Sequence, residues 1–149
     1  FVMRSADSHL DFDLDLAKSS SQDNPVYYVQ YAHARICSIL RQAQEAGAAP
    51  TGAKDPDWCR LTEEVEYDLL RKIADFPEVI VGAALALEPH RLTKYADELA
   101  NTFHGFYTKC RVINPDLELQ QARLELVNCV RITLRNVLGI IGIVAPEKM

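Results

Sequence analysis

The sequence predicts an all-α protein, a bundle of about five helices with a short extended segment at its N-terminal end. Apolar residues recur every three or four positions in five segments, which is the spacing of one helix face. Asn-Pro pairs precede two of these segments, and the connections between segments are short. Helices joined in this way pack around a single core, so we expect a helical bundle.

Residues 8–16 differ from the rest, because leucine and phenylalanine alternate there with aspartate. Period-2 alternation is typical of a half-buried strand or extended segment. The aspartate spacing also resembles the start of a calcium loop, but Leu16 occupies the required glycine position and Gln22 the required glutamate position. We therefore expect an extended segment without a metal.

The first long helix should begin at Asn24 and Pro25, because Asn caps free amide groups and Pro fits the first helical position. It should stop near Gly47. Its apolar stripe comprises Val29, Ala32, Ile36, Ile39, Leu40 and Ala43.

Four further helices follow from the same spacing and from proline and asparagine positions. We expect them from Thr62 to about Asp75, from Pro77 through Leu87, from Pro89 to about Cys110, and from Asn114-Pro115 to about Gly142.

The net charge of −5 argues against indiscriminate nucleic-acid binding, which usually accompanies a basic excess. The charge is uneven, however. Residues 1–24 and 49–88 carry −3 and −5, whereas residues 25–48 and 89–115 carry +1 and +2. A local RNA-binding surface on the two positive segments is therefore compatible with the composition.

The longest apolar stretch, around residues 79–87, is far shorter than a membrane span, and no signal peptide is evident. The four cysteines are widely separated, which does not suit a zinc site and favours free thiols in a reducing cytoplasm. We expect a cytoplasmic protein without a membrane partner.

Catalytic motifs such as a P-loop or a nucleophile elbow are absent from the sequence. His33, His90 and His104 stand apart from any evident nucleophile. His33 lies at the edge of the first apolar stripe, so we expect it to make a structural hydrogen bond.

Tyr28, Tyr31 and Arg35 fall within about 60° of one another on the first long helix. Two tyrosines and an arginine in a row can stack on unpaired bases and bind a phosphate. The same row could instead be an aromatic rim that packs on a neighbouring helix. The spacing alone leaves both interpretations open.

Two terminal motifs resemble one known family. DFDLDLAKSSSQDNPVYYVQYAHARI resembles the junction in arginyl-tRNA synthetases, which are class I synthetases, between the catalytic domain and the anticodon-binding domain. LGIIGIVAPEKM resembles the C-terminus of that family. The resemblance covers essentially all 149 residues. It implies that residues 1–22 are a remnant of the junction and that residues 23–149 form the all-α anticodon-binding domain.

The resemblance also implies six tRNA-binding positions: Tyr28, Tyr31, Arg35, Arg41, Tyr107 and Met149. The two helix tyrosines and Tyr107 correspond to aromatic contacts, the arginines to cationic contacts, and Met149 to a terminal methionine against the middle anticodon base. Two features depart from the pattern. Arg41 points about 80° from Tyr31 on an ideal helix, and Lys148 replaces the usual arginine before the final Met.

The function implied is recognition of the anticodon loop of arginine tRNA for a longer arginine–tRNA ligase. The chain begins at Phe1 and lacks the family's ATP signatures, so we expect a fragment without the ATP and arginine sites. ATP and Mg²⁺ would serve the parent enzyme, whose catalytic domain would be the second partner besides the tRNA; DNA is not expected as a partner. The alternative is a helical protein–protein interaction module without RNA binding, which the net negative charge favours.

Overall fold

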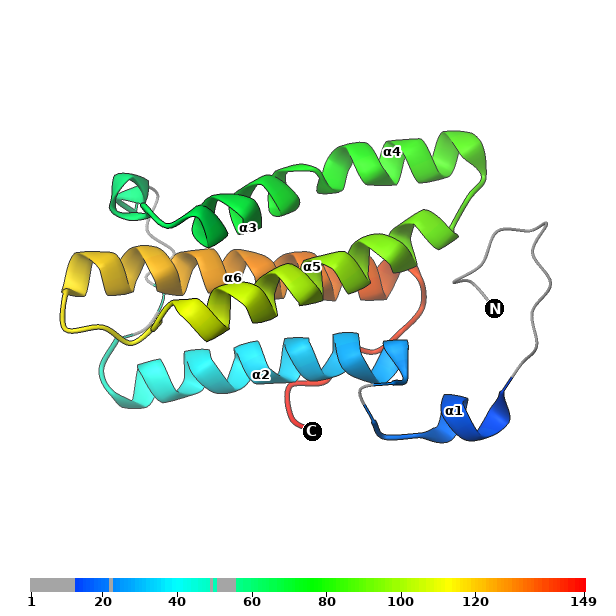
Figure 1. Cartoon of the computed structure of the whole chain (residues 1–149), viewed down its shortest axis with the longest axis horizontal. Coiled ribbons are helices and arrows are strands. Elements are labelled where there is room, and N and C mark those ends of the chain that lie inside the picture. The colour runs from blue at the N-terminus through cyan, green and yellow to red at the C-terminus, as the bar shows by residue number, and fades with distance from the viewer. Residues whose placement is uncertain (1–12, 22, 49, 51–55) are drawn as a thin grey trace.

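A computed structural model of the chain describes residues 13–21, 23–48, 50 and 56–149. These residues form helices without a strand, which confirms the all-α prediction (Figure 1). The helices are α1 (Leu14–Lys18), α2 (Pro25–Glu45), α3 (Glu64–Ala74), α4 (Phe76–Ala86), α5 (His90–Lys109) and α6 (Leu117–Ile140), with a short 3₁₀ helix, η1 (Trp58–Arg60).

The extended segment predicted at the N-terminal end is wrong for residues 14–16, which belong to α1. Asp13 caps this helix, because its side chain accepts hydrogen bonds from the backbone N–H groups of Asp15 and Leu16, each at 2.9 Å. No residue of α1 is buried. The alternation of leucine and aspartate therefore does not separate a buried face from an exposed one, as it would in a half-buried strand. Residues 8–12 and Gln22 lie outside the described residues. The domain boundary expected after residue 22 stays a prediction.

The start and end of α2 lie where the sequence predicts them. The Asn24 side chain accepts a hydrogen bond from Val26 N at 3.1 Å and donates one to Ser19 O at 2.9 Å. The chain leaves the helix at Gly47, whose φ of +78° is easy for glycine. The expected stripe is buried, with Leu40 half-buried at its edge.

The last helix begins later than Asn114-Pro115 would suggest. Asp116 is its N-cap, and the Asp116 carboxylate accepts hydrogen bonds from Glu118 N at 3.2 Å and Leu119 N at 3.1 Å. Asn114 instead accepts a hydrogen bond from Asp116 N at 3.0 Å in the preceding turn. Asn and Asp cap helices about equally well, so the sequence could not separate the two positions.

The helices pack as a bundle in which α5 and α6 run between α2 on one side and α3 with α4 on the other (Figure 1). Phe103 and Phe106 of α5 and Ile36 of α2 are fully buried in its core. A buried ion pair joins α3 to α6, with 2.7 Å between Arg123 Nε and Glu66 Oε1. Within the described ranges, no helix is long and apolar enough to cross a membrane.

Candidate functional site

The C-terminal residues return along α2 and are attached to it at three points. Gln30 Nε2 donates to the carbonyl of Val144 at 2.8 Å, and Arg41 Nη2 donates to that of Glu147 at 3.4 Å. Between them, His33 Nδ1 lies 2.8 Å from Pro146 O. We call residues 144–149 the tail. These contacts fix the tail against the helix that carries most of the predicted site.

His33 has the structural role that the sequence predicts. A carbonyl only accepts, so His33 Nδ1 must carry the proton in the bond to Pro146 O. Burial lowers the pKa of His33, and this effect outweighs the hydrogen bond to Pro146, which acts in the opposite direction. The imidazole is therefore neutral at physiological pH and holds the tail as a donor.

A pocket of about 290 Å³ lies between α2 and the tail. It brings together four of the six predicted positions: Tyr31, Arg35, Arg41 and Met149. Ala34, Ser38, Glu147 and Lys148 complete its lining. The volume is close to the lower end of the range for small-ligand sites, about 300–1,000 Å³, so the pocket is suited to a group of the size of one base.

Tyr107 lies beside this pocket and contacts one of its cations. The guanidinium carbon of Arg35 is 5.2 Å from the centroid of the Tyr107 ring, which is within cation–π distance. Arg35 Nη2 also donates to the Tyr107 hydroxyl at 3.5 Å. The arginine that the sequence places in a row with two tyrosines therefore joins α2 to α5.

Tyr28 lies nearer the start of α2, and its side chain makes contacts within the bundle. Its hydroxyl donates to Asn101 Oδ1 at 2.8 Å, and its ring packs against the edge of the core. Burial, followed by the charge of Asp97, raises the pKa of Tyr28. This position fits the interpretation of the row as an aromatic rim on a neighbouring helix. Tyr31 is half-buried and lines the pocket instead.

His104 of α5 connects the two tyrosines, a role that the sequence analysis missed. Its ring centroid is 5.1 Å from that of Tyr28 and 6.4 Å from that of Tyr31, and it is stacked on the latter. Burial and then the nearby charge of Arg35 lower its pKa. The only signal in the sequence is that His104 precedes Tyr107 by three residues, which places both on one helix face.

Basic side chains border the tail on both flanks. Arg35, Arg41 and Lys148 line the 290 Å³ pocket, together with one acid, Glu147. A second hollow, of about 570 Å³, shares Arg41 and Glu147 with the first and adds Arg131 of α6. The local surface is thus positive although the whole chain carries a net charge of −5. Aromatic rings and cations in one place are the groups that bind an unpaired nucleotide.

Residues 29–149 match the family described as the DALR anticodon binding domain. The chain belongs to the DALR anticodon binding domain family. The matched residues include all six predicted positions except Tyr28. The string Asp-Ala-Leu-Arg is itself absent from this member of the family.

Comparison with single proteins agrees with this assignment to the DALR family. The chain is 58% identical to an arginine–tRNA ligase of Symbiobacterium thermophilum and 57% identical to one of Moorella thermoacetica, over all 149 of its residues. It covers 27% of each of these relatives, so it spans about a quarter of their length.

The solved arginyl-tRNA synthetase of Thermus thermophilus superposes with a TM-score of 0.76 at 34% identity, over 94% of this chain and 24% of that one. The resemblance to arginyl-tRNA synthetases seen in the sequence is thereby confirmed.

Proposed function

We propose that this chain binds the anticodon loop of arginine tRNA on behalf of a longer arginine–tRNA ligase. The observation that carries the proposal is the pocket between α2 and the tail, where Tyr31, Arg35, Arg41 and Met149 meet. Tyr107 and His104 extend the aromatic surface next to it. Membership of an anticodon-binding family and 58% identity to an arginine–tRNA ligase support the same role.

The proposed mechanism follows from base chemistry and from the genetic code. All arginine codons have G in the middle position, so every arginine tRNA has C in the middle of its anticodon. In our proposal the loop bases are splayed apart and stack on Tyr31 and Tyr107, while Arg35 and Arg41 bind phosphates. Glu147 and backbone carbonyl groups of the tail can accept hydrogen bonds from the cytosine amino group.

The chemical step belongs to the parent enzyme in this proposal. The parent would join arginine to its tRNA with ATP and Mg²⁺, using sites in the part of the polypeptide that this chain does not contain. The role of the present chain is to hold the anticodon loop and so to select the tRNA. Cytoplasmic location is part of the same proposal, because protein synthesis supplies its tRNA partner.

The proposal is tested by replacing the two stacking rings one at a time. Tyr31→Ala and Tyr107→Ala should each weaken arginine tRNA binding about 5- to 150-fold, because stacking on an aromatic ring contributes about 1–3 kcal/mol per base. Tyr67→Ala is the matched control, since Tyr67 is an exposed tyrosine on α3, on the other side of the bundle. If both variants are folded and bind like the wild type, the aromatic-pocket proposal fails.

The second candidate, an interaction module without RNA binding, is favoured by the partly buried position of Tyr28 and its bond to Asn101. A gel-shift assay with arginine tRNA separates the two candidates. An interaction module would shift neither this tRNA nor one with a changed middle anticodon base.

A further inference from the structure

Helix α4 is apolar on nearly every side, yet Ala83 is its only buried residue. Val81 is 56% exposed, Leu85 is 82% exposed, and Leu87, which ends the helix, is 87% exposed. We call these three side chains the α4 surface. A helix that is apolar all round is normally enclosed by other structure. The described part of this chain leaves the α4 surface uncovered.

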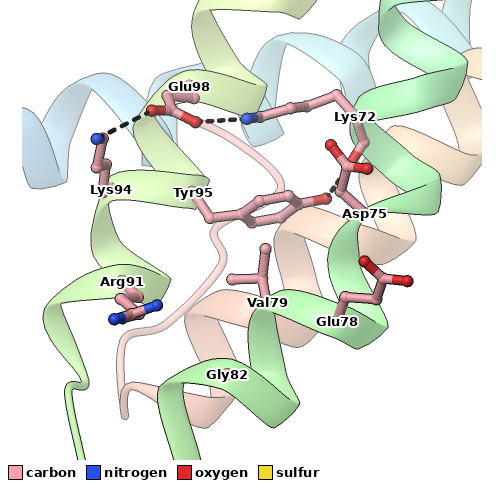
Figure 2. A pocket seen from close by; sticks show the side chains of 9 residues that line it. All are labelled: Lys72, Asp75, Glu78, Val79, Gly82, Arg91, Lys94, Tyr95 and Glu98. Atoms are coloured by element: carbon pink, nitrogen blue, oxygen red, sulfur yellow. Dashed lines mark hydrogen bonds and ion pairs between the residues drawn. The ribbon is translucent and has the colours of Figure 1, made fainter. Parts of the chain in front are cut away.

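The inner side of α4, by contrast, has its partners within the chain. Figure 2 shows Val79 and Gly82 facing α5 next to Tyr95 and Arg91. The hollow of about 380 Å³ between them is not a candidate ligand site, because its cations are already paired. Glu98 binds both Lys72 and Lys94, and Arg91 binds Glu88. The unpartnered side of α4 is therefore the outer one.

The backbone conformation of Leu87 also indicates that the outer side of α4 lacks its partner. Its φ is +56°, a left-handed conformation that costs energy for residues other than glycine. α2 and α6 end with the same kind of backbone hydrogen bonds across the last helical turn. In those two helices the residue with positive φ is a glycine, Gly47 or Gly142, where α4 has Leu87. At α4 the corresponding bonds run from Leu87 N to Ala84 O and from Glu88 N to Ala83 O. A leucine here gains almost no burial within the chain to offset the strain.

The position of the α4 surface suggests what covers it. The C-terminal end of α4 lies at the same end of the bundle as α1 and the start of α2 (Figure 1). This chain matches the C-terminal 27% of its ligase relatives, so in those relatives the remaining polypeptide precedes the matched part and is joined to it on the N-terminal side of α1. Leu14 and Leu16 of α1 are also exposed there. Exposed apolar side chains thus occur on both sides of this end of the bundle, on α4 and on α1.

We infer that the α4 surface is a docking site for the polypeptide that precedes this chain in its longer relatives. The partner surface should be mainly apolar, because it covers Val81, Leu85 and Leu87. Glu78, an exposed acid three residues before Val81, limits the apolar area toward the start of the helix. The bundle would then be attached to the preceding polypeptide at two places, covalently on the N-terminal side of α1 and by packing at α4. Two attachments fix its orientation relative to that polypeptide. The inference rests on the length of the relatives and does not depend on RNA binding.

Cysteine accessibility tests this inference directly. Leu85→Cys and Leu87→Cys are made in the 149-residue chain and in a chimera in which this chain replaces the matching part of the Symbiobacterium ligase. The rate of modification by N-ethylmaleimide is measured for each introduced thiol by peptide mass spectrometry. Leu117→Cys is the matched control, because Leu117 is 72% exposed at the opposite end of the bundle. The buried Cys37 and Cys110 report whether each protein is folded.

The inference predicts that the thiols introduced by Leu85→Cys and Leu87→Cys react at least tenfold more slowly in the chimera than in the separate chain. The thiol of the Leu117→Cys control should react equally in both. Equal rates for Leu85→Cys and Leu87→Cys in the two proteins would overturn the inference. Slow modification of these thiols that is already seen in the separate chain and is lost on dilution would also overturn the inference, because a second copy of this chain would then cover the α4 surface. If the first chimera is unfolded, the Moorella ligase provides a second one at 57% identity.

Discussion

His104 shows how a single side chain can matter to the site without carrying a charge. Its ring contacts those of both Tyr28 and Tyr31, and the charge of Arg35 lowers its pKa further after burial has done so. A neutral imidazole can stack on one phenol ring and contact the other at an angle, and it leaves the positive charge of the site to the arginines. Protonation would place a second cation next to Arg35 in a half-buried position.

This arrangement predicts a pH dependence of stability. The folded-state pKa of His104 is below the ordinary value of 6.5, so its contribution is complete above that value and is lost as the pH falls below it. The free energy of unfolding should therefore decrease as the pH falls below about 6.5. His104→Phe keeps an aromatic ring and should reduce that decrease, which urea titrations at several pH values can measure. An unchanged pH profile in the variant would contradict the assignment.

Leu87 gives a second prediction at the scale of one residue. Leu87→Gly should stabilise the separate chain by about 1 kcal/mol, because glycine adopts a positive φ without the steric cost that leucine has there. Thermal unfolding should show a melting temperature higher by roughly 2–5 °C. Leu85→Gly is the control, since it lies inside the helix and should lower stability instead. A less stable Leu87→Gly chain would mean that the leucine contributes within this chain.

The types and spacing of residues in the sequence predicted part of the pocket between α2 and the tail. The spacing of Tyr28, Tyr31 and Arg35 predicted a row on one helix, and the structure places Tyr31 and Arg35 in the pocket. The sequence could not show that Tyr28 turns toward Asn101, because that contact spans 73 positions of the chain. The role of His104 was hidden for the same reason, since its neighbours Tyr28 and Tyr31 belong to another helix.

At the scale of helices, local signals predicted most of the elements. Asn24 before Pro25 and Gly47 after the last turn mark both ends of α2, because caps act over only a few residues. The same kind of signal failed at α6, where Asp116 rather than Asn114 is the cap. At α1 a different signal failed, because the period-2 alternation suggested an extended segment where Asp13 caps a helix.

A buried ion pair contributes to the attachment of α3 to α6 and leads to a prediction of its own. Glu66 is fully buried, its Oε1 accepts from Arg123 Nε at 2.7 Å, and its Oε2 accepts from Glu63 N at 2.9 Å. Arg123→Met leaves an uncompensated carboxylate and should cost about 3–5 kcal/mol of unfolding free energy. Urea titration measures this loss.

The double variant Arg123→Met with Glu66→Gln is the control for that measurement. It removes both charges and should recover a large part of the stability, because the cost comes mainly from the unpaired partner. If the double variant is as unstable as the sum of the two single ones, the ion pair is not what couples α3 to α6.

The whole molecule separates its charges. Residues 1–24 and 49–88 carry the excess negative charge, −3 and −5, whereas the segments that contribute α2 and α5 are positive, so the whole chain has a net charge of −5. An acidic protein can therefore present a small basic pocket in which Arg35, Arg41 and Lys148 are the cations. Binding to RNA should then rely on few phosphate contacts and on stacking.

The salt dependence of tRNA binding tests this picture. With about three phosphate contacts, the logarithm of the association constant should fall with the logarithm of the salt concentration at a slope near −2, since each contact to a single strand contributes about −0.7. Arg41→Gln should reduce the slope by about 0.7. Arg71→Gln changes an exposed arginine on α3 and should leave the slope unchanged. A slope that Arg41→Gln does not alter would remove Arg41 from the interface.

The central claim is that the pocket between α2 and the tail recognises the middle base of an arginine anticodon. Its most direct test is the affinity of the folded wild-type chain for arginine tRNA and for the same tRNA with its middle anticodon C changed to U, measured by fluorescence anisotropy. If the pocket reads this base, the unchanged tRNA should bind about 5- to 150-fold more tightly, which corresponds to about 1–3 kcal/mol for one recognised base. Equal affinity for the two tRNAs, or binding to neither, would contradict it.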